Sequence, residues 1–376
     1  MTDFSPASAE EIAEIVKVAA TNREPLEILG NGTKRGIGRP MSMPHRLSTA
    51  RLDGIVLYEP EELILSVKAG TPLSQVEALL AEHNQHLAFE PPNWGNQTIG
   101  GVVAAGYSGP RRIHAGAIRD HLLGFTAING RGEIFKAGGR VVKNVTGYDL
   151  SKLMAGSFGT LAVLSDVTLK VLPKPESRTT LFRRGQSAHD GIKLLNKALG
   201  LPFEMTGAAW TPDFNGTSLT ALRLEGFADS VADRAVALTR ILDVEIGDAE
   251  FDTFWDQIRE VAPLQPASVL WRISVPPSRG AEILDILPGA DAIADWGGGL
   301  IWLGMADEGD CGASALRTAV KETGGHATLI RASDECRLRI APFQSQTTAH
   351  FALTKRVKES FDPLHILNPG RMYANL

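Results

Sequence analysis

Between Trp94 and Pro175 the sequence contains, in order, Asn96-Gln97-Thr98-Ile99-Gly100-Gly101, Gly109-Pro110-Arg111-Arg112, Gly116-Ala117-Ile118-Arg119-Asp120, Lys143-Asn144-Val145-Thr146-Gly147-Tyr148-Asp149 and Gly156-Ser157-Phe158-Gly159-Thr160-Leu161. Glycine is dense here, between segments that read as strands. Because glycine lacks a Cβ, it lets backbone N–H groups approach a ligand closely and adopts positive φ without strain. The pattern favours a large phosphate-bearing cofactor; a loop-rich β domain whose glycines only form turns is the alternative.

The composition is that of a soluble globular protein of 376 residues, which is long enough for two or three domains. A net charge of -5 argues against nucleic acid as the main partner. No apolar run approaches the roughly 20 residues that span a bilayer, and the N-terminus does not read as a secretory signal. We therefore expect a cytoplasmic protein with no direct membrane span.

The chain contains two cysteines, Cys311 and Cys336. This excludes a self-contained iron–sulfur cluster, which takes four thiolates, and a Cys-x-x-Cys-His haem attachment. We expect both cysteines to be small core residues. His83 and His86 lack a third ligand at metal-binding spacing, so no metal site is predicted.

The first part of the chain predicts a small α+β unit. A buried strand over Leu26–Leu29 leads into Gly30-Asn31-Gly32-Thr33-Lys34-Arg35-Gly36, which suits a phosphate-binding nest, although an ordinary surface turn has the same composition. Further strands are predicted over 54–58, 63–69, 122–128, 133–136 and 160–172, with a helix starting at Leu73. Pro173 and Pro175 mark the first domain boundary.

From Glu176 to about Arg331 the pattern changes. Strand-like runs (219–226, 269–275, 300–305, 326–330) alternate with helical patterns (188–199, 230–242, 251–261, 311–323). This predicts a sheet covered by helices on one face. A helix around 349–361 and the rigid turn Asn368-Pro369-Gly370-Arg371 end the chain.

Taken together, these segments resemble the FAD-binding fold of the vanillyl-alcohol oxidase family. Gly30–Gly36 is similar to the first pyrophosphate loop of that family, and Thr98-Ile99-Gly100-Gly101 to the Thr-Ile-Gly-Gly of its second pyrophosphate segment. The segment 156–161 resembles its Gly-Ser-x-Gly-Thr-Leu motif, and 368–371 its C-terminal Asn-Pro-Gly-Lys/Arg. The resemblance implies an α+β fold with a two-subdomain PCMH-type FAD-binding domain over residues 1–175. It also implies a cap domain with an antiparallel sheet over 176–331 and a C-terminal segment, 332–376, that returns to the flavin site.

A closer resemblance is to the smaller FAD-binding (E) subunits of bacterial glycolate oxidases. It is carried by the segments 109–112, 116–120, 143–149 and Leu169-Lys170-Val171-Leu172-Pro173. It implies a subunit of a complex that oxidises glycolate, a small 2-hydroxy acid, to glyoxylate. The implied partners are a larger paralogous FAD-binding subunit and an iron–sulfur subunit, through which the complex could associate with a membrane. A non-catalytic assembly subunit with structural FAD, or a free-standing FAD oxidoreductase for another hydroxylated substrate, remain alternatives.

Two departures from the family pattern refine the expectation. The His-x-Gly-Asp-Gly-Asn-x-His motif of metal-dependent relatives does not occur in this chain. The first pyrophosphate loop contains no histidine, so we expect FAD to be bound non-covalently. The resemblance, with the glycine pattern, gives these cofactor-binding candidates: Gly30, Asn31, Gly32, Thr33, Lys34, Thr98, Ile99, Gly100, Gly101, Gly106, Gly109, Gly116, Gly159, Thr160 and Val163.

Oxidation of a 2-hydroxy acid needs a cation for the carboxylate and a base for the hydroxyl proton. Arg371 is the favoured cation because its turn resembles one that reaches the flavin in relatives; Arg331, Arg337 and Arg339 are the other candidates. Lys143 and Tyr148 could supply proton-transfer or hydrogen-bonding groups. The identity of the base stays open.

Overall fold

The computed structural model describes residues 2–139, 148–251, 253–286 and 290–376. The chain forms two compact units. The first comprises Met1–Ser108, Gly116–Lys174 and Ser345–Leu376, and the second comprises Gly109–Ala115 and Pro175–Gln344. A seven-residue segment from the middle of the glycine-rich region therefore belongs to the second unit.

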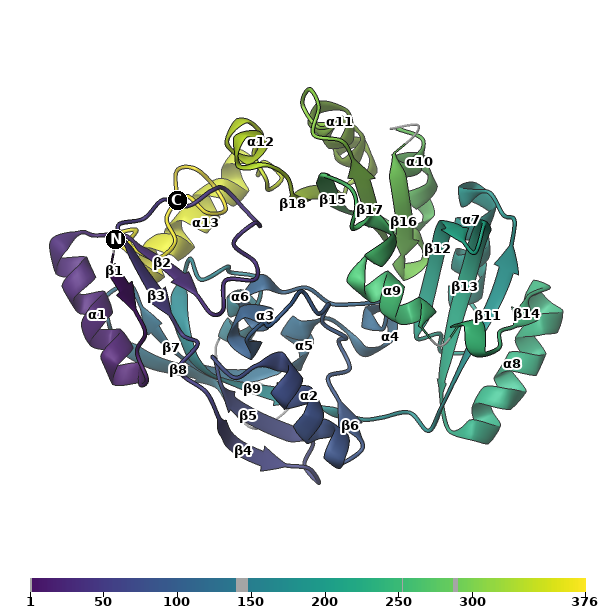
Figure 1. Cartoon of the computed structure of the whole chain (residues 1–376), viewed down its shortest axis with the longest axis horizontal. Helices are drawn as coiled ribbons and strands as arrows, with labels where there is room; N and C mark the ends of the chain where they lie inside the picture. Colours follow the sequence, from purple (N-terminus) through teal and green to yellow (C-terminus); the bar gives the residue numbers. More distant parts are fainter. Residues whose placement is uncertain (1, 140–147, 252, 287–289) are drawn as a thin grey trace. The chain divides into compact units, whose positions relative to one another are not determined.

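The first unit contains a small parallel sheet in the order β1-β3-β2, formed by β1 (Thr2–Phe4), β3 (His45–Ser48) and β2 (Leu26–Leu29). Helix α1 (Ala9–Asn22) begins at Ser8, whose Oγ accepts a hydrogen bond from the N–H of Glu11 at 3.1 Å. Its apolar residues recur every three or four positions, so they form one buried stripe with the strand residues. This helix lies beside the small sheet in Figure 1.

The larger sheet of the first unit is antiparallel, in the order β4-β5-β9-β7-β8. Its strands are β4 (Ile55–Glu59), β5 (Ile64–Lys68), β9 (Ala162–Lys170), β7 (Leu122–Asn129) and β8 (Ile134–Gly138). A two-stranded ribbon pairs β6 (Gln85–His86) with β10 (Leu172–Pro173). The other helices of this unit are α2 (Leu73–Glu82), α3 (Ile99–Ala105), α5 (Ile118–His121), α6 (Leu150–Met154) and α13 (Thr348–Phe361).

The end of the chain returns to β2. Leu367 forms a parallel bridge with Leu26, and the N–H of Leu26 donates to the carbonyl of Ile366 at 2.7 Å. In Figure 1 the yellow C-terminal segment accordingly lies beside the purple strand β2. The two terminal regions thus contribute to one layer of the first unit.

The second unit is an eight-stranded antiparallel sheet in the order β14-β11-β13-β12-β16-β17-β15-β18. Its strands are β11 (Ser177–Arg184), β12 (Gly207–Phe214), β13 (Thr217–Gly226), β14 (Glu245–Ile246), β15 (Val269–Ser274), β16 (Asp291–Asp295), β17 (Leu300–Met305) and β18 (His326–Arg331). Its helices are α4 (Arg112–Ala115), α7 (Ala188–Leu199), α8 (Ala228–Leu242), α9 (Phe254–Glu260), α10 (Gly280–Leu284), α11 (Ala313–Thr323) and α12 (Asp334–Arg339).

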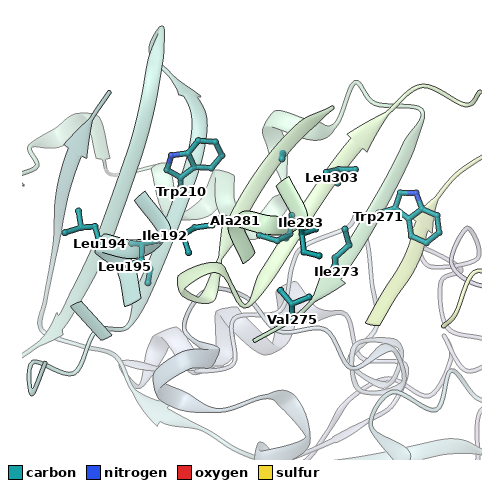
Figure 2. Close-up of a cluster of buried hydrophobic side chains, with 14 of the residues drawn as sticks. Ile192, Leu194, Leu195, Trp210, Trp271, Ile273, Val275, Ala281, Ile283 and Leu303 are labelled. Carbon is teal, nitrogen blue, oxygen red and sulfur yellow. The ribbon is translucent and has the colours of Figure 1, made fainter. Parts of the chain in front are cut away.

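The core of the second unit lies on one face of this sheet. Alternate strand residues such as Trp271, Ile273 and Leu303 pack against helix residues such as Ile192 and Ile283, as Figure 2 shows. The intervening strand residues, which include Arg272 and Trp302, therefore belong to the opposite face. Helix α9 covers part of that opposite face: Trp255 donates to Thr180 Oγ1 at 3.0 Å.

The predicted α+β class and the antiparallel sheet of the cap are confirmed. The helix over 188–199 and the strand over 300–305 have the predicted bounds. Strands β11, β12 and β16 were not predicted, because their sequences lack a clear apolar alternation. The second unit continues to Gln344, so α12 lies in it. No helix of the described ranges is long and apolar enough to cross a membrane.

Candidate cofactor site

A groove in the first unit brings together segments that are far apart in sequence. It contains about 720 Å³ of empty space, part of it open to solvent. It is lined by the end of β2 and the loop after it, by α3, by the turn before β9 and by the C-terminal turn. The lining residues are Ile28, Leu29, Gly30, Asn31, Gly32, Thr33, Lys34, Arg35, Thr49, Ala69, Thr98, Gly100, Gly101, Ala104, Ala105, Ser157, Phe158, Gly159, Ala162, Leu164 and Arg371.

The two glycine segments meet at Gly30 and Thr98. A Cβ on Gly30 would lie 2.2 Å from Thr98 Oγ1, far inside van der Waals contact, so only glycine fits without a shift. Thr98 is buried, and its Oγ1 caps α3 by accepting from the N–H of Gly101 at 3.2 Å. On the other side, a Cβ on Gly100 would lie 2.7 Å from the carbonyl oxygen of Ala69. Backbone rather than side chains therefore forms this wall of the groove.

The first loop (Gly30–Gly36) is held by polar side chains. Asn31 Nδ2 donates to the carbonyl of Asn96 at 2.9 Å, which ties this loop to the second glycine segment. Arg35 forms a bidentate ion pair with buried Glu27 at 2.6 and 2.9 Å, and Arg46 donates to the same carboxylate at 3.2 Å. A buried carboxylate with two guanidinium partners fixes the loop at the end of β2.

Lys34 places a cation at the groove. Its Nζ donates to Gln97 Oε1, and Gln97 Nε2 donates to the carbonyl of Pro92 at 2.6 Å. Burial, together with the positive charge of Arg371, lowers the pKa of Lys34 to about 8. A bound anion would favour the charged form again, so this lysine suits a phosphate group better than a neutral ligand.

The C-terminal turn closes another side of the groove. Asn368 is fully buried: its Oδ1 accepts from the N–H of Ile28 at 2.7 Å, and its Nδ2 donates to the carbonyls of Ile28 and Phe158 at 3.1 and 2.8 Å. Arg371 Nη2 donates to the carbonyl of Lys34 at 3.0 Å, and its guanidinium lies 5.6 Å from the ring centroid of Phe158. The Asn-Pro-Gly-Arg turn therefore contacts both the first loop and the turn before β9.

A buried ion pair supports this turn. Lys358 Nζ donates to Asp362 at 2.6 Å, to the carbonyl of Thr160 at 2.7 Å and to that of Leu367 at 2.9 Å. Asp362 also accepts from the N–H groups of Ile366 and Leu367 at 3.1 and 2.8 Å. Burial lowers the pKa of Lys358 although Asp362 opposes the shift.

The groove brings together most of the predicted cofactor-binding residues. The predicted residues that line it are Gly30, Asn31, Gly32, Thr33, Lys34, Thr98, Gly100, Gly101, Gly159 and, among the catalytic candidates, Arg371. Their contact with a cofactor stays a prediction.

Other predicted residues lie outside the groove lining. Ile99 and Val163 are completely buried in the apolar core. Gly106 ends α3 with φ 75°, and a Cβ there would lie 2.9 Å from Gly156 Cα. Thr160 Oγ1 donates to the carbonyl of Ser157 at 2.7 Å. These residues pack behind the residues that line the groove.

Two further glycines have structural surroundings of their own. Gly116 adopts φ 87° and packs against Asp120, whose carboxylate accepts from the N–H of Ala117 at 2.9 Å. Gly109 belongs to the second unit, where its carbonyl accepts from Trp296 Nε1 at 3.1 Å.

The catalytic candidates are not all at the groove. Tyr148 is 93% exposed, and Lys143 lies outside the described residues. The remaining arginine candidates belong to the second unit and bond there. Arg331 donates to the carbonyl of Leu264 at 2.6 Å, Arg339 to that of Gly309 at 2.9 Å, and Arg337 pairs with Asp334.

Several groove residues were not predicted individually. Ser157 and Phe158 line the groove and stand inside the Gly-Ser-Phe-Gly motif. Asn368 is buried behind the lining and stands in the C-terminal turn, so both motifs contained the signal. Ala104 and Ala105 are small residues of α3, and no sequence pattern distinguishes them from ordinary helix positions.

The groove has the chemistry that a dinucleotide flavin requires. Backbone and hydroxyl donors with one lysine and two arginines suit a pyrophosphate, and small apolar side chains suit rings. A Cβ added at Gly30 would clash with Thr98, so the close packing of the two glycine segments depends on glycine at this position. The residues present therefore fit FAD.

Comparison with known proteins agrees with this chemistry. Residues 3–138 match the family described as FAD binding domain. Over 377 aligned residues the chain is 36% identical to glycolate oxidase subunit GlcE of Escherichia coli (strain K12), covering 100% of this chain and 99% of that protein. The chain belongs to the GlcE family. FAD as the cofactor of this family member is confirmed.

More distant relatives preserve the fold. Glycolate oxidase subunit GlcD of Bacillus subtilis (strain 168) is 24% identical over 99% of this chain and 88% of that protein. The structure of p-cresol methylhydroxylase with substrate bound aligns with a TM-score of 0.77 at 14% identity, covering 99% of this GlcE-family chain and 88% of that chain. An alkyldihydroxyacetonephosphate synthase structure aligns with a TM-score of 0.70 at 16% identity, covering 98% of this chain and 75% of that chain. These similarities confirm the predicted PCMH-type fold.

Proposed function

We propose that this chain is the FAD-binding subunit of a glycolate oxidase, in which glycolate is oxidised to glyoxylate and the electrons pass to partner subunits. The observation that carries the proposal is the full-length match to the GlcE subunit. The glycine-walled groove supports it, because that groove supplies the donors that a flavin dinucleotide needs.

Residues of this chain have distinct roles in the proposal. The first loop (Gly30–Gly36) holds the pyrophosphate through backbone N–H groups, and Lys34 adds a positive charge. The segment Thr98–Gly101 forms the wall beside that loop, since the N–H groups of Ile99, Gly100 and Gly101 donate within the protein. Arg371, held by Lys34 and Phe158, orients the C-terminal turn toward the groove. When bound, FAD supplies the two-electron oxidation. The first loop contains no histidine, which supports non-covalent binding.

The proposal assigns residues 1–175 to FAD binding, 176–331 to the cap and 332–376 to the segment that returns to the flavin. It also assigns the partners. With two cysteines in the whole chain, an iron–sulfur cluster of its own is excluded, so the electrons leave through another protein or a diffusible acceptor. A larger FAD-binding subunit and an iron–sulfur subunit would complete the complex, which would be cytoplasmic or held at a membrane by those partners.

A second candidate function is that of an assembly subunit whose FAD is structural. Tyr148 is almost fully exposed and does not line the groove, and this favours catalysis on a paralogous partner. In that case the chain would still bind FAD, but glycolate would not reduce it.

Anaerobic spectroscopy separates the two functions. The chain is purified alone and with its partner subunits, and the visible flavin absorption is recorded before and after glycolate is added. The proposed function predicts that the flavin of this chain is bleached, either alone or in the complex. A flavin-loaded chain that stays oxidised in a complex that turns over glycolate would support the assembly function. A complex that never oxidises glycolate would refute the proposal.

A further inference from the structure

The face of the second sheet opposite the helix layer carries a cluster of cations. Arg272 on β15 lies directly across from Trp302 on β17 and from Thr328 on β18. Its guanidinium lies 5.2 Å from the ring centroid of Trp296 and 5.9 Å from that of Trp302. Both indole rings belong to buried residues, so they form a rigid apolar wall beside the guanidinium.

A second guanidinium lies over the same indole. Arg112 belongs to the short segment Gly109–Ala115, and its guanidinium lies 4.2 Å from the centroid of Trp296. The neighbouring Arg111 fixes this segment through a buried bidentate ion pair with Glu225 at 2.6 and 2.9 Å. The position of Arg112 is therefore determined by the fold of the second unit.

Trp296 is itself held in an unfavourable backbone conformation. Its φ is 54°, which is rare for a bulky residue, and its two neighbours in the turn are Asp295 and Gly297. Asp295 is buried, and its carboxylate accepts from the N–H of Trp296 at 2.7 Å. Trp296 Nε1 donates to Gly109 at 3.1 Å. Strain of this kind persists where the surrounding structure enforces it, and it is enriched at ligand-binding sites.

His326 is a third nitrogen-bearing side chain near the two guanidinium groups. It lies across from Ser274 at the start of β18, one alternation from Arg272. The ring of His326 is partly desolvated although the residue as a whole is exposed, and this desolvation, with the positive charges of Arg272 and Arg112, lowers the pKa of His326. A histidine with a lowered pKa stays neutral near pH 7, when it can both donate and accept a hydrogen bond.

We infer that Arg112 and Arg272, set around Trp296, form the subsite that holds the carboxylate of a small 2-hydroxy acid. This inference rests on the proposed function for the identity of the ligand, and it gives a role to Arg272 and to Arg112 of the segment 109–112, neither of which was a predicted site residue. A guanidinium has five N–H donors in a planar fork, so it can hold a carboxylate in addition to its contacts with the protein. His326 provides a hydrogen-bond partner for the 2-hydroxyl group.

The simpler interpretation is that the two arginines only pack against tryptophans. The charge-retaining variant Arg272→Lys and the neutral variants Arg272→Gln and Arg112→Gln distinguish these interpretations. Arg279→Gln is the matched control, because Arg279 belongs to the same unit but pairs on the surface with Glu282. All variants are made in the full chain and loaded with FAD. The comparison uses variants whose melting temperature and flavin content equal those of the wild type.

The experiment is calorimetric titration of these proteins with glycolate, alone and with the partner subunits. The wild type and Arg279→Gln should bind glycolate equally. Arg272→Gln and Arg112→Gln should each bind it roughly 10- to 100-fold more weakly, because each loses a charge-assisted hydrogen-bond donor. Arg272→Lys should lie between, since it keeps the charge but loses the fork. Unchanged affinity in both glutamine variants would overturn the inference.

A second measurement covers the possibility that the neutral variants do not fold. Wild-type protein is modified with phenylglyoxal, which reacts with arginine, and the modified residues are mapped by mass spectrometry with and without glycolate. Glycolate should protect Arg112 and Arg272 and leave Arg279 unprotected. No protection at either residue overturns the inference.

The outcomes also separate this subsite from the proposed function. If the complex oxidises glycolate while the arginine variants bind it normally, the subsite is wrong and the function stands. If glycolate binds in an Arg272-dependent manner but the complex does not oxidise it, the subsite stands and the function is wrong. If glycolate binding cannot be detected in either preparation, the subsite is wrong.

Discussion

The side-chain amide of Asn368 bonds both backbone groups of Ile28, accepting from its N–H at 2.7 Å and donating to its carbonyl at 3.1 Å. The two residues are 340 positions apart in the sequence. A side-chain amide that bonds both backbone groups of one strand residue replaces the partner strand that β2 would otherwise need at this edge. The integrity of the groove in the first unit therefore depends on the last residues of the chain.

Replacing Asn368 with alanine should destabilise the first unit by about 2–4 kcal/mol, because Ile28 and Phe158 would lose partners for buried polar groups. Thermal unfolding and flavin retention measure this effect. Asn368→Asp is the informative companion variant, since its carboxylate can still accept from Ile28 but cannot donate to the two carbonyls. Equal melting temperatures for the wild type and the alanine variant would contradict the structural role.

Replacing Gly30 with alanine should abolish or strongly reduce flavin retention. The added Cβ would lie 2.2 Å from Thr98 Oγ1, so the two glycine segments would have to separate. The ratio of flavin to protein after gel filtration measures this effect.

Gly36→Ala is the matched control for that variant. Gly36 lies in the same loop, but an added Cβ there has no heavy atom within 4 Å. It should retain flavin as the wild type does. Full retention by Gly30→Ala would show that the pyrophosphate does not bind where we place it.

FAD binding should take up a proton at Lys34. The pKa of Lys34 is about 8 without a bound anion, and a nearby pyrophosphate would raise it. A group whose pKa is higher in the bound state stabilises binding fully below pH 8, and this contribution is lost as the pH rises through the bound-state pKa. Titration calorimetry above pH 8 in two buffers of different ionisation enthalpy measures the uptake. Lys34→Met should remove it; persistence of the uptake in that variant would assign it to another group.

Cys311 and Cys336 should form an intramolecular disulfide when oxidised. Their Sγ atoms lie 3.0 Å apart in the core of the second unit. With the diazene oxidant diamide, the two thiols would lose two electrons and two protons to the nitrogen–nitrogen double bond as the S–S bond forms. Burial, with the hydrogen bonds to Cys336 and Asp307, raises the pKa of Cys311 to about 12, so the reaction should be slow near neutral pH.

Thiol titration and intact-protein mass measure that reaction. The wild type should lose both thiols without forming a dimer, and Cys336→Ser should keep its remaining thiol under the same conditions. Disulfide-linked dimers of the wild type as the main product would show that the two thiols do not meet in solution.

Local patterns predicted the elements well where apolar spacing was regular, as in the helix Ala188–Leu199 and the strand Leu300–Met305. They failed at β11 (Ser177–Arg184), where threonine and arginine obscure the alternation. The glycine motifs indicated both walls of the groove, because the absence of a Cβ is visible in a sequence. The bond between Asn368 and Ile28, and the pair formed by Arg111 and Glu225, connect distant positions, and a single sequence contains no record of such pairing.

The predicted catalytic residues were the least accessible to sequence reasoning. Arg371 lies at the groove, as its motif suggested, but Tyr148 is exposed although it stands in an equally distinctive motif. A motif identifies a family position without saying which way its side chain points. Of the cations around Trp296, Arg112 stands in the Gly-Pro-Arg-Arg segment and Arg272 stands in no recognisable motif. Their proximity could not be predicted, because strand register and a segment from elsewhere in the chain bring them together.

The path of residues 109–115 limits how this protein could be dissected. A fragment cut at the proline boundary and expressed as the N-terminal half would keep Arg111 but lose Glu225, which is its counter-ion in the intact fold. The complementary fragment would bury Glu225 beside Arg223 without the bidentate partner that, against the opposing effect of burial, helps to hold its pKa below the ordinary value. Although the chain has two compact units, they are interleaved along the polypeptide, so neither half can be excised with its ion pairs intact.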